Sequence, residues 1–355
     1  TNKTTLNGDI GTIGLQDDNC YHVVVSAGNV GTAELDGFSI INGRGLQTGV
    51  SGSAINGTGV ILQHGAGLNC AVSSPRITNC RFENNIVSNV GEGGGGAMYI
   101  SLNSQPVISQ CSFSMNVAAL SGGAIFTGSQ FDVSISNCNF SNNQAPANGG
   151  GAIYVANNAR ATIDQSMFTE NEGLFGGAIL NSAGVITKVY RSSFSLCDAD
   201  FGGAIHNNVN SSLEVDSSTF AQNSGIYGGA IHAINSANVT LSSCSFSENN
   251  AFVNGGVIFA VPGVDGTLTD CIFSANTADN NGNVLWFDNS SDFLFLRCRF
   301  ENNGIANPGG CTIFSGGSTS RFENCIIKGN IADYDHLLMS VASNTHLINT
   351  EITGN

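Results

Sequence analysis

The stretch that decides the fold is GGAIFTG at residues 122–128, which returns four times in nearly the same form. The later copies read GGAIYVA (150–156), GGAILNS (176–182), GGAIHNN (202–208) and GGAIHAI (228–234). A glycine pair weakens a regular strand or helix, yet apolar residues follow the pair every time. A motif that recurs with a period of roughly 20–50 residues indicates a repeat architecture. We therefore expect each glycine pair to make the same bend once per repeat.

A second motif, Cys-x-Phe-x-x-Asn, recurs with a similar period. It begins as CRFENN at 80–85, continues as CSFSMN (111–116) and CNFSNN (138–143), and ends as TEITGN at 350–355. After a first step of 31 residues, its third position recurs every 25 to 28 residues. That position is Phe82, Phe113, Phe140, Phe168, Phe194, Phe220, Phe246, Phe273 and Phe300, with Ile327 and Ile352 at the end.

The spacing within each repeat predicts short strands. Cysteine and phenylalanine lie two residues apart, and a further apolar residue, such as Ile108 or Ile135, precedes each cysteine by three. Aromatic and β-branched residues with a period of two are typical of strands. The sequence therefore predicts an all-β fold, a right-handed single-stranded parallel β-helix with about 26–27 residues per turn and roughly 12–13 turns. We expect one continuous domain over 1–355, with irregular turns in 1–81 and regular repeats in 82–355.

The apolar triplet after each glycine pair poses a question of orientation. Neighbouring side chains of a strand point to opposite faces, and the nearly uniform isoleucine of the second position suits the interior. The third position then faces outward, unless the chain turns a corner there; the reverse orientation is the alternative. This mixed column is a candidate interaction surface, made of Tyr99, Phe126, Tyr154, His206, His232, Phe259 and Trp286, with Ile313 as its last member.

The asparagine column favours a structural role. Asparagine tolerates left-handed backbone at turns, and stacked amides can bond one another; metal ligation is the alternative. The column is Asn85, Asn116, Asn143, Asn171, Asn223, Asn249, Asn276, Asn303 and Asn330.

The cysteine column indicates buried thiols, because free cysteine behaves as a small apolar residue. Some disulfides between neighbouring turns, or metal ligation, are the alternatives. Cys20 and Cys70 are the best candidates for a bridge outside the column.

Composition excludes some classes of function. The 355 residues carry 11 Lys and Arg against 26 Asp and Glu, a net charge of −15, so nucleic-acid binding is not expected. No apolar run approaches the roughly 18 residues that cross a bilayer, so this segment should not insert into a membrane. The chain begins at Thr1 rather than Met, which suggests a processed or excised piece of a longer protein.

Catalysis would need charged groups that converge on one patch, and the basic residues are scattered. The acidic pairs Asp198/Asp200 and Glu170/Glu172 flank the asparagine turn, where solvated carboxylates are ordinary. Loops 43–57 and 86–94 are the best place for an active site, yet neither contains an acid/base pair. We therefore predict no enzyme, no cofactor and no metal.

The repeats are similar to those of a known family. The Gly-Gly-Ala-Ile and Phe-x-x-Asn motifs resemble the repeats of chlamydial polymorphic outer membrane proteins and related bacterial surface β-helix proteins. LNGDIGTIGLQDDNCYHVV from Leu6, LDGFSIINGRG (35–45) and SSPRITNCRF (73–82) resemble the start of such regions in large secreted proteins. The resemblance implies a right-handed β-helix displayed outside the cell, often as an adhesin or passenger domain, without catalytic residues.

Two classes of function follow. The first is a non-enzymatic extracellular protein: a cell-surface adhesin or passenger, or a filament subunit that assembles through the ends of the helix or an exposed apolar column. Its partners would be further copies of itself, or a glycan or protein of a host surface. The alternative is a carbohydrate-active enzyme, of polysaccharide lyase or glycosidase type, or a glycan-binding module on the same scaffold.

Overall fold

A computed structural model describes residues 4–45, 52–88, 93–101, 103–128, 130–304, 310–331 and 337–355. Short strands and turns make up almost all of these residues, together with one 3-10 helix, Gln16–Asp18. Contacts divide the chain into unit 1, Thr1–Val185, and unit 2, Ile186–Asn355. A single continuous domain over 1–355 stays a prediction.

Unit 1 contains four parallel sheets, each named here after the column that it carries. The Phe sheet has the order β1 (Thr4–Asn7), β4 (Phe38–Ile41), β10 (Arg81–Glu83), β14 (Ser112–Ser114), β18 (Asn139–Ser141) and β22 (Met167–Thr169). The triplet sheet has β2 (Val24–Ala27), β8 (Leu68–Ala71), β12 (Met98–Ile100), β16 (Ile125–Thr127), β20 (Ile153–Val155) and β24 (Ile179–Asn181). The Ile sheet has β3 (Glu34–Asp36), β9 (Arg76–Thr78), β13 (Val107–Ser109), β17 (Asp132–Ser136) and β21 (Arg160–Asp164). The Asn-turn sheet has β5 (Arg44–Gly45), β11 (Ile86–Val87), β15 (Val117–Ala118), β19 (Gln144–Ala145) and β23 (Glu172–Phe175). An antiparallel hairpin of β6 (Ser53–Ile55) and β7 (Thr58–Val60) forms a separate two-stranded sheet.

Unit 2 repeats the same four sheets. Its Phe sheet has β26 (Ser193–Ser195), β30 (Thr219–Ala221), β34 (Ser245–Ser247), β38 (Ile272–Ser274), β42 (Arg299–Glu301), β45 (Ile326–Lys328) and β48 (Glu351–Thr353). Its triplet sheet has β28 (Ile205–Asn207), β32 (Ile231–Ile234), β36 (Ile258–Val261), β40 (Leu285–Asp288), β43 (Ile313–Gly316) and β46 (Leu338–Val341). Its Ile sheet has β25 (Ile186–Tyr190), β29 (Ser212–Asp216), β33 (Asn238–Ser242), β37 (Asp265–Thr269), β41 (Asp292–Leu296), β44 (Thr319–Glu323) and β47 (Asn344–Ile348). Its Asn-turn sheet has β27 (Asp198–Phe201), β31 (Ser224–Tyr227), β35 (Asn250–Asn254) and β39 (Thr277–Ala278).

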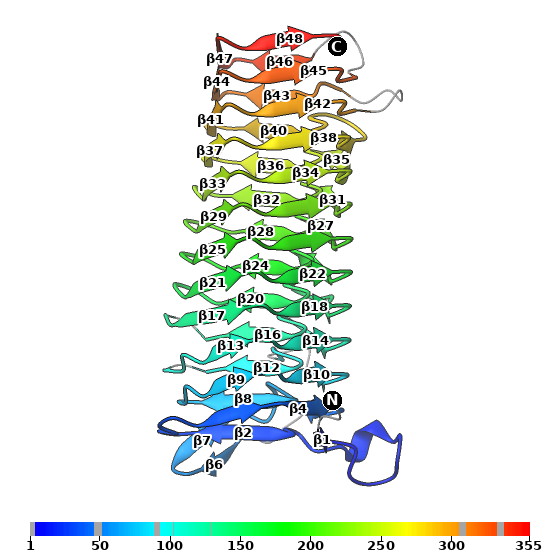
Figure 1. The fold of residues 1–355 in the computed structure, drawn as a ribbon, viewed down its shortest axis with the longest axis vertical. Coiled ribbons are helices and arrows are strands. Elements are labelled where there is room, and N and C mark those ends of the chain that lie inside the picture. The colour runs from blue at the N-terminus through cyan, green and yellow to red at the C-terminus, as the bar shows by residue number, and fades with distance from the viewer. Residues whose placement is uncertain are drawn as a thin grey trace. The chain divides into compact units, whose positions relative to one another are not determined.

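Each turn of the β-helix contributes its strands to the sheets in the same order. In unit 1, β13, β14, β15 and β16 follow one another through the Ile, Phe, Asn-turn and triplet sheets, and β17 then pairs with β13 in parallel. Figure 1 shows the strands of each unit stacked in this way. The predicted parallel β-helix is therefore confirmed.

Stacked phenylalanines fill the interior behind each Phe sheet. In unit 1, Phe82, Phe113, Phe140 and Phe168 are fully buried, and consecutive ring centroids lie 4.8–4.9 Å apart. In unit 2, the stack from Phe194 to Phe300 repeats at 4.7–5.1 Å. This spacing equals the distance of about 4.8 Å between neighbouring strands, so the rings are stacked in register.

The triplet turns a corner at its first residue. The second position points inward, since Met98, Ile125 and Ile153 have no exposed surface. The first position, which would face outward on a straight strand, is buried as well, as at Ala124. Gly122 has a φ of +66°, a left-handed conformation that glycine adopts readily, so the chain bends just before the alanine.

The last triplet lies one residue further along the chain than the sequence predicts. Ile313, expected in the third position, pairs with Leu285 of the second, and Phe314 pairs with Trp286. The Trp286 and Phe314 rings stack at 5.2 Å. The actual register therefore keeps an aromatic ring in the third column.

Candidate binding site

The asparagine column forms hydrogen-bonded ladders inside both units. Asn116 donates from Nδ2 to Oδ1 of Asn143 at 2.9 Å and to the carbonyl of Phe82 at 3.1 Å. The same pattern joins Asn223, Asn249, Asn276, Asn303 and Asn330 in unit 2. The left-handed residue of each turn is the one before the ladder, for example Asn142 with φ +54°. These amides therefore hold successive turns together. Within the described ranges, no group of three or more His, Cys, Asp or Glu side chains could hold a metal ion.

All eleven cysteines are free thiols in the structure. The predicted disulfide between Cys20 and Cys70 does not form, because the two residues lie beside different sheets. Cys70 pairs in register with Ser26 and Ile100 in the triplet sheet. Cys20 instead donates its backbone N–H to Gly8, beside the Phe sheet. Complete burial raises the pKa of Cys70 to about 12, so this thiol is protonated at neutral pH.

The third triplet column lies outside the interior but is not an open surface. In unit 1, Tyr99, Phe126 and Tyr154 are half-buried and stack at 5.4 and 4.8 Å. His64 covers the first ring at 4.5 Å.

In unit 2, the expectation of an exposed apolar column is wrong at three positions. His206, His232 and Phe259 are only 1%, 4% and 9% exposed, whereas Trp286 is half-buried. Strands β27 and β31 run beyond the asparagine turn, and their aromatic residues pack on the column. The Phe201 ring lies 5.2 Å from His232, and the Tyr227 ring lies 5.0 Å from Phe259.

The two histidines of this column form a buried neutral pair. Their Nδ1 atoms are 2.9 Å apart, so one ring donates and the other accepts. Burial lowers the pKa of His206 to about 3, and burial together with the neighbouring His206 holds the pKa of His232 well below its ordinary value. Both side chains are therefore structural at neutral pH.

The most distinctive open surface is a loop of unit 1, residues 8–19, which we call the N-terminal loop. Its own carboxylates fix its conformation. Asp9 Oδ2 accepts from the backbone N–H of Gly14 at 2.9 Å, and Asp18 Oδ2 accepts from that of Thr12 at 2.7 Å. The Asp18 carboxyl packs so closely on Gly11 that a Cβ there would meet it at 2.1 Å. The loop is therefore preorganised.

This rigid loop presents apolar side chains to solvent. Ile10, Ile13 and Leu15 are 67%, 92% and 49% exposed, and Ile13 is the most exposed large apolar residue in the described parts of the chain. Apolar groups gathered on an exposed surface commonly mark an interaction site.

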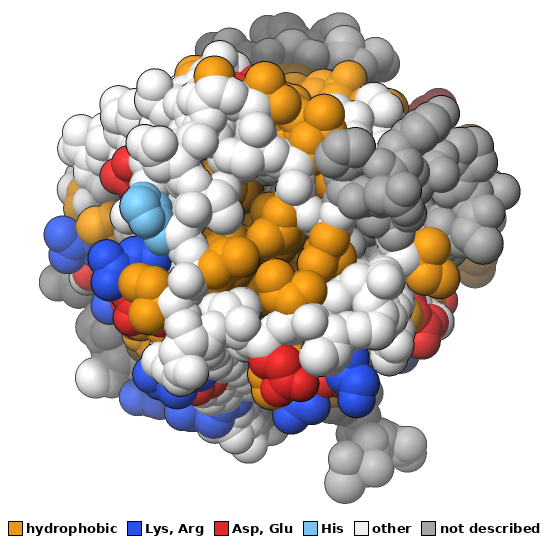
Figure 2. Space-filling model, turned by 90° about the horizontal axis from the view of Figure 1, so that it is seen from above, with side chains coloured by type: hydrophobic (Ala, Val, Ile, Leu, Met, Phe, Trp, Pro, Cys, Tyr) orange, Lys and Arg blue, Asp and Glu red, His pale blue; other side chains and the backbone are white. Residues whose placement is uncertain are grey.

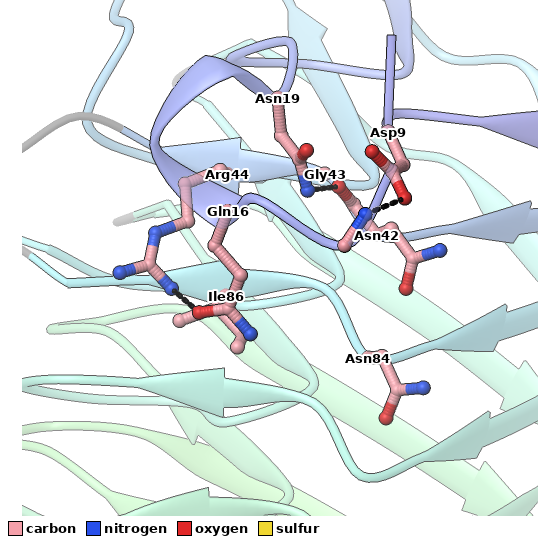
Figure 3. A pocket seen from close by; sticks show the side chains of 9 residues that line it. Asp9, Gln16, Asn19, Asn42, Gly43, Arg44, Asn84 and Ile86 are labelled. Atoms are coloured by element: carbon pink, nitrogen blue, oxygen red, sulfur yellow. Dashed lines mark hydrogen bonds between the residues drawn. The ribbon is translucent and has the colours of Figure 1, made fainter. Parts of the chain in front are cut away.

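A polar pocket of about 420 Å³ lies beside the N-terminal loop (Figure 3). Four of its nine lining residues carry side-chain amides, and Asn19 donates from Nδ2 to the Asn42 carbonyl at 2.8 Å. Arg44 donates to Gln16 Oε1 at 2.7 Å. The carboxyl group of Asp9 also faces the pocket, and its Oδ1 is buried without a hydrogen-bond partner, as is Oδ1 of Asn19. The pocket therefore brings amide, carboxyl and guanidinium groups together.

The loops predicted as the best place for an active site contribute residues to this pocket. Gly43, Arg44 and Ile86 line the pocket and belong to the loops 43–57 and 86–94, of which residues 46–51 and 89–92 lie outside the described parts. The sequence of the N-terminal loop does not predict a site through its family resemblance. The available signal was three glycines at Gly8, Gly11 and Gly14, with isoleucines between them. Glycines this close favour a tight loop, which cannot bury the residues between them.

Comparison with protein families identifies the fold. The family model described as a right handed beta helix region matches residues 18–194 and 176–355. No curated protein sequence matches significantly. A solved structure, the "Crystal structure of PfbA, a surface adhesin of Streptococcus pneumoniae", is similar at 11% identity and a TM-score of 0.37, over 94% of this chain and 84% of that one. Similarity at this level says nothing about function. Among the described residues, no helix is long and apolar enough to span a membrane.

Proposed function

Because the chain belongs to the right-handed β-helix family, whose fold alone does not define an activity, we propose that it is a non-enzymatic extracellular protein of adhesin type. It binds surface glycans or glycoproteins through the N-terminal loop and the adjacent polar pocket. The observation that carries this proposal is a preorganised apolar loop beside a pocket rich in amides. The predicted handedness follows from the family, whereas the resemblance to the chlamydial repeats stays a prediction.

Rigidity favours a binding role for the loop. Its conformation is held by hydrogen bonds from Gly14 to Asp9 and from Thr12 to Asp18. A partner that covers Ile13 therefore gains apolar burial without first ordering the loop, and this lowers the entropic cost of binding.

The chemistry of the pocket favours binding over catalysis. Asp9 is the single carboxylate among the nine lining residues, and no histidine lines the pocket. Glycoside hydrolysis ordinarily uses two carboxyl groups that flank the scissile bond. Amides, one carboxylate and one guanidinium instead supply the donors and acceptors that suit the hydroxyl groups of a sugar.

The experiment pairs a binding assay with a turnover assay. The protein is coupled to fluorescent beads, and bead retention is measured on glycan arrays and on cultured cell surfaces. The same preparation is incubated with a panel of polysaccharides, and reducing ends and unsaturated products are followed. The proposal expects saturable retention that Asp9→Asn and Arg44→Gln weaken, without product release. Product release by the wild-type protein that Asp9→Asn abolishes would contradict it and favour the carbohydrate-active enzyme.

A filament subunit is the second candidate, and the C-terminal turn of unit 2 favours it. Apolar side chains gather at the centre of the face that Figure 2 shows. Residues Met339, Val341, Leu347, Ile348 and Ile352 of β46, β47 and β48 are 36–48% exposed. Strand edges with apolar side chains favour pairing with another chain. Sedimentation over a range of concentrations tests this: self-association that Leu347→Lys weakens supports it, and a monomer at high concentration contradicts it.

A further inference from the structure

A second cavity of unit 1 lies at its first turn, between the triplet sheet and the Ile sheet. It has a volume of about 370 Å³, and we call it the first-turn hollow. Ten of its twelve lining residues are apolar, and the other two are Ser26 and Glu34. None of the twelve lines the polar pocket beside the N-terminal loop. The two cavities are therefore separate sites of opposite character.

The first-turn hollow reaches into the interior of the β-helix. Val24 and Leu35 hold interior positions of the first turn, because they pair in register with Leu68 and Ile77 of the next turn. Leu68 and Ile77 are 2% and 0% exposed, whereas Val24 and Leu35 are only half-buried. All four side chains line the hollow. The interior of the first turn is therefore incompletely filled by its own side chains.

The β6–β7 hairpin supplies one wall of the hollow. Figure 1 shows the hairpin beside β2, where Val60 packs with Ala27 and Ala71 in a buried cluster. Asn56 donates from Nδ2 to the Ala27 carbonyl at 3.4 Å. Ile55 of the hairpin lines the hollow and is 41% exposed. The wall is therefore attached to the triplet sheet, and the hollow keeps its shape without a ligand.

The lining of the hollow selects an apolar ligand with a positive charge at one end. Apolar cavities hold water poorly and bind apolar molecules, and this volume lies at the small end of the range of about 300–1,000 Å³ for ligand pockets. Among the described residues that line it, Glu34 is the only charged one, and its side chain is exposed. Its carboxylate attracts a cation and repels an anion, and the net charge of −15 acts in the same direction. We propose that the first-turn hollow binds a free single-chain amphiphile with a cationic head group, of alkylamine type.

The alkyl chain and the head group contribute differently to binding. The chain packs against Val24, Leu35 and Leu68, and each methylene that the hollow buries tightens binding about fourfold until the hollow is full. Thr78 donates from Oγ1 to Glu34 Oε1 at 3.1 Å and orients the carboxylate, whose Oε2 accepts from the ammonium group. This inference is independent of the proposed adhesin function, because the two sites share no lining residue.

The test uses the whole chain labelled with ¹³C at the valine and leucine methyl groups. Octylammonium, hexylammonium, 1-octanol and octanoate are titrated in at concentrations at which each stays monomeric, and methyl NMR signals are followed. Octylammonium should shift the signals of Val24, Leu35 and Leu68 saturably, whereas the signal of Leu241, buried in unit 2, should not move. Hexylammonium, two methylenes shorter, should bind about 15-fold more weakly. Octanol should bind about threefold more weakly than octylammonium, since Glu34 is exposed, and octanoate should bind more weakly than octanol.

Three variants make the test specific to the hollow. Glu34→Gln should abolish the preference for octylammonium over octanol and leave the affinity for octanol unchanged. Asp36→Asn is the matched control: Asp36 is exposed on the same strand and also accepts from Thr78, at 3.2 Å, but it does not line the hollow, so the preference should remain.

Ala33→Trp should fill the hollow and abolish binding of all four probes at an unchanged melting temperature, because Ala33 lines the hollow and is exposed. The site is refuted if octylammonium and octanol leave the three methyl signals unshifted, or if octanoate binds as tightly as octylammonium. It is also refuted if Asp36→Asn abolishes the preference as Glu34→Gln does, or if the Ala33→Trp protein binds like the wild type.

Discussion

Replacing Asn143 by alanine tests whether the asparagine ladder stabilises the β-helix. The Asn143 side chain is fully buried and makes four hydrogen bonds. Its Nδ2 donates to the Phe113 carbonyl at 3.0 Å and to Asn171 Oδ1 at 2.9 Å. Its Oδ1 accepts from the backbone N–H and from Nδ2 of Asn116 at 3.2 and 2.9 Å.

The expected loss follows from these bonds. A buried hydrogen bond contributes about 1 kcal/mol net, and an unsatisfied buried partner costs about 1–3 kcal/mol more. Asn143→Ala removes four bonds and leaves their partners buried, so we expect a loss of about 4 kcal/mol or more in the free energy of local unfolding. Asn139→Ala is the matched control. Asn139 is exposed on the neighbouring strand β18, so its replacement should change stability by less than about 0.5 kcal/mol.

Native-state hydrogen exchange is the suitable assay, because turns of a repeat protein can open locally. In Asn143→Ala the amides of β14, β18 and β22 should lose protection, whereas the Asn139→Ala protein should exchange like the wild type. A loss below about 1 kcal/mol in Asn143→Ala would refute the structural role of the ladder, because water or a neighbouring amide would then satisfy the exposed groups equally well.

Three further predictions concern stability. Phe140→Ala, in the middle of the buried stack, should cost about 3–5 kcal/mol in a denaturation experiment, whereas Phe252→Ala should have little effect because that ring is 57% exposed. Stability should fall as pH drops below about 6.5, by about 1.4 kcal/mol per pH unit for His206 until pH approaches about 3, and His232 should add to the loss in the same direction, because the unfolded chain binds protons that the buried pair does not bind. Replacing both histidines by phenylalanine should flatten that dependence in urea titrations, and an unchanged slope would contradict the neutral pair. The melting temperature should be unaffected by EDTA, and a decrease of tens of degrees would reveal a structural hard cation.

The sequence predicts the interior of the turns well because each interior position sees the same environment in every turn. Phe140 packs between Phe113 and Phe168, the equivalent residues of the two neighbouring turns. The same packing therefore selects phenylalanine at this position in turn after turn. A column of this kind specifies both the strand period and the register.

Structural features that occur only once, or that depend on contacts between residues of different columns, are harder to predict from the sequence. His232 and Phe259 are buried because Phe201 and Tyr227 approach from the next sheet, and nothing in the triplet itself predicts that cover. At β43 the register follows the stacking of Phe314 on Trp286, whereas the glycine pair suggested an assignment one residue away.

The candidate site lies in the irregular N-terminal turns, where no repeat fixes the alignment. Asp9 and Asp18 bond backbone groups five and six residues away along the chain. These local contacts, which the spacing of residues does not reveal, hold Ile13 in solvent. The pocket then forms where this loop meets Asn42 and Arg44 of another turn.

The most direct test of the adhesin account is bead retention by a loop variant with a matched control. Ile10, Ile13 and Leu15 are replaced together by serine in one protein, and the exposed Val107, Phe252 and Ile272 are replaced by serine in the other. All six side chains are exposed, so both proteins should fold with nearly unchanged stability. The account predicts that retention on cell surfaces falls at least about tenfold in the loop variant, the factor that corresponds to 1.4 kcal/mol, and is unchanged in the control. Equal retention by the two variants would contradict it.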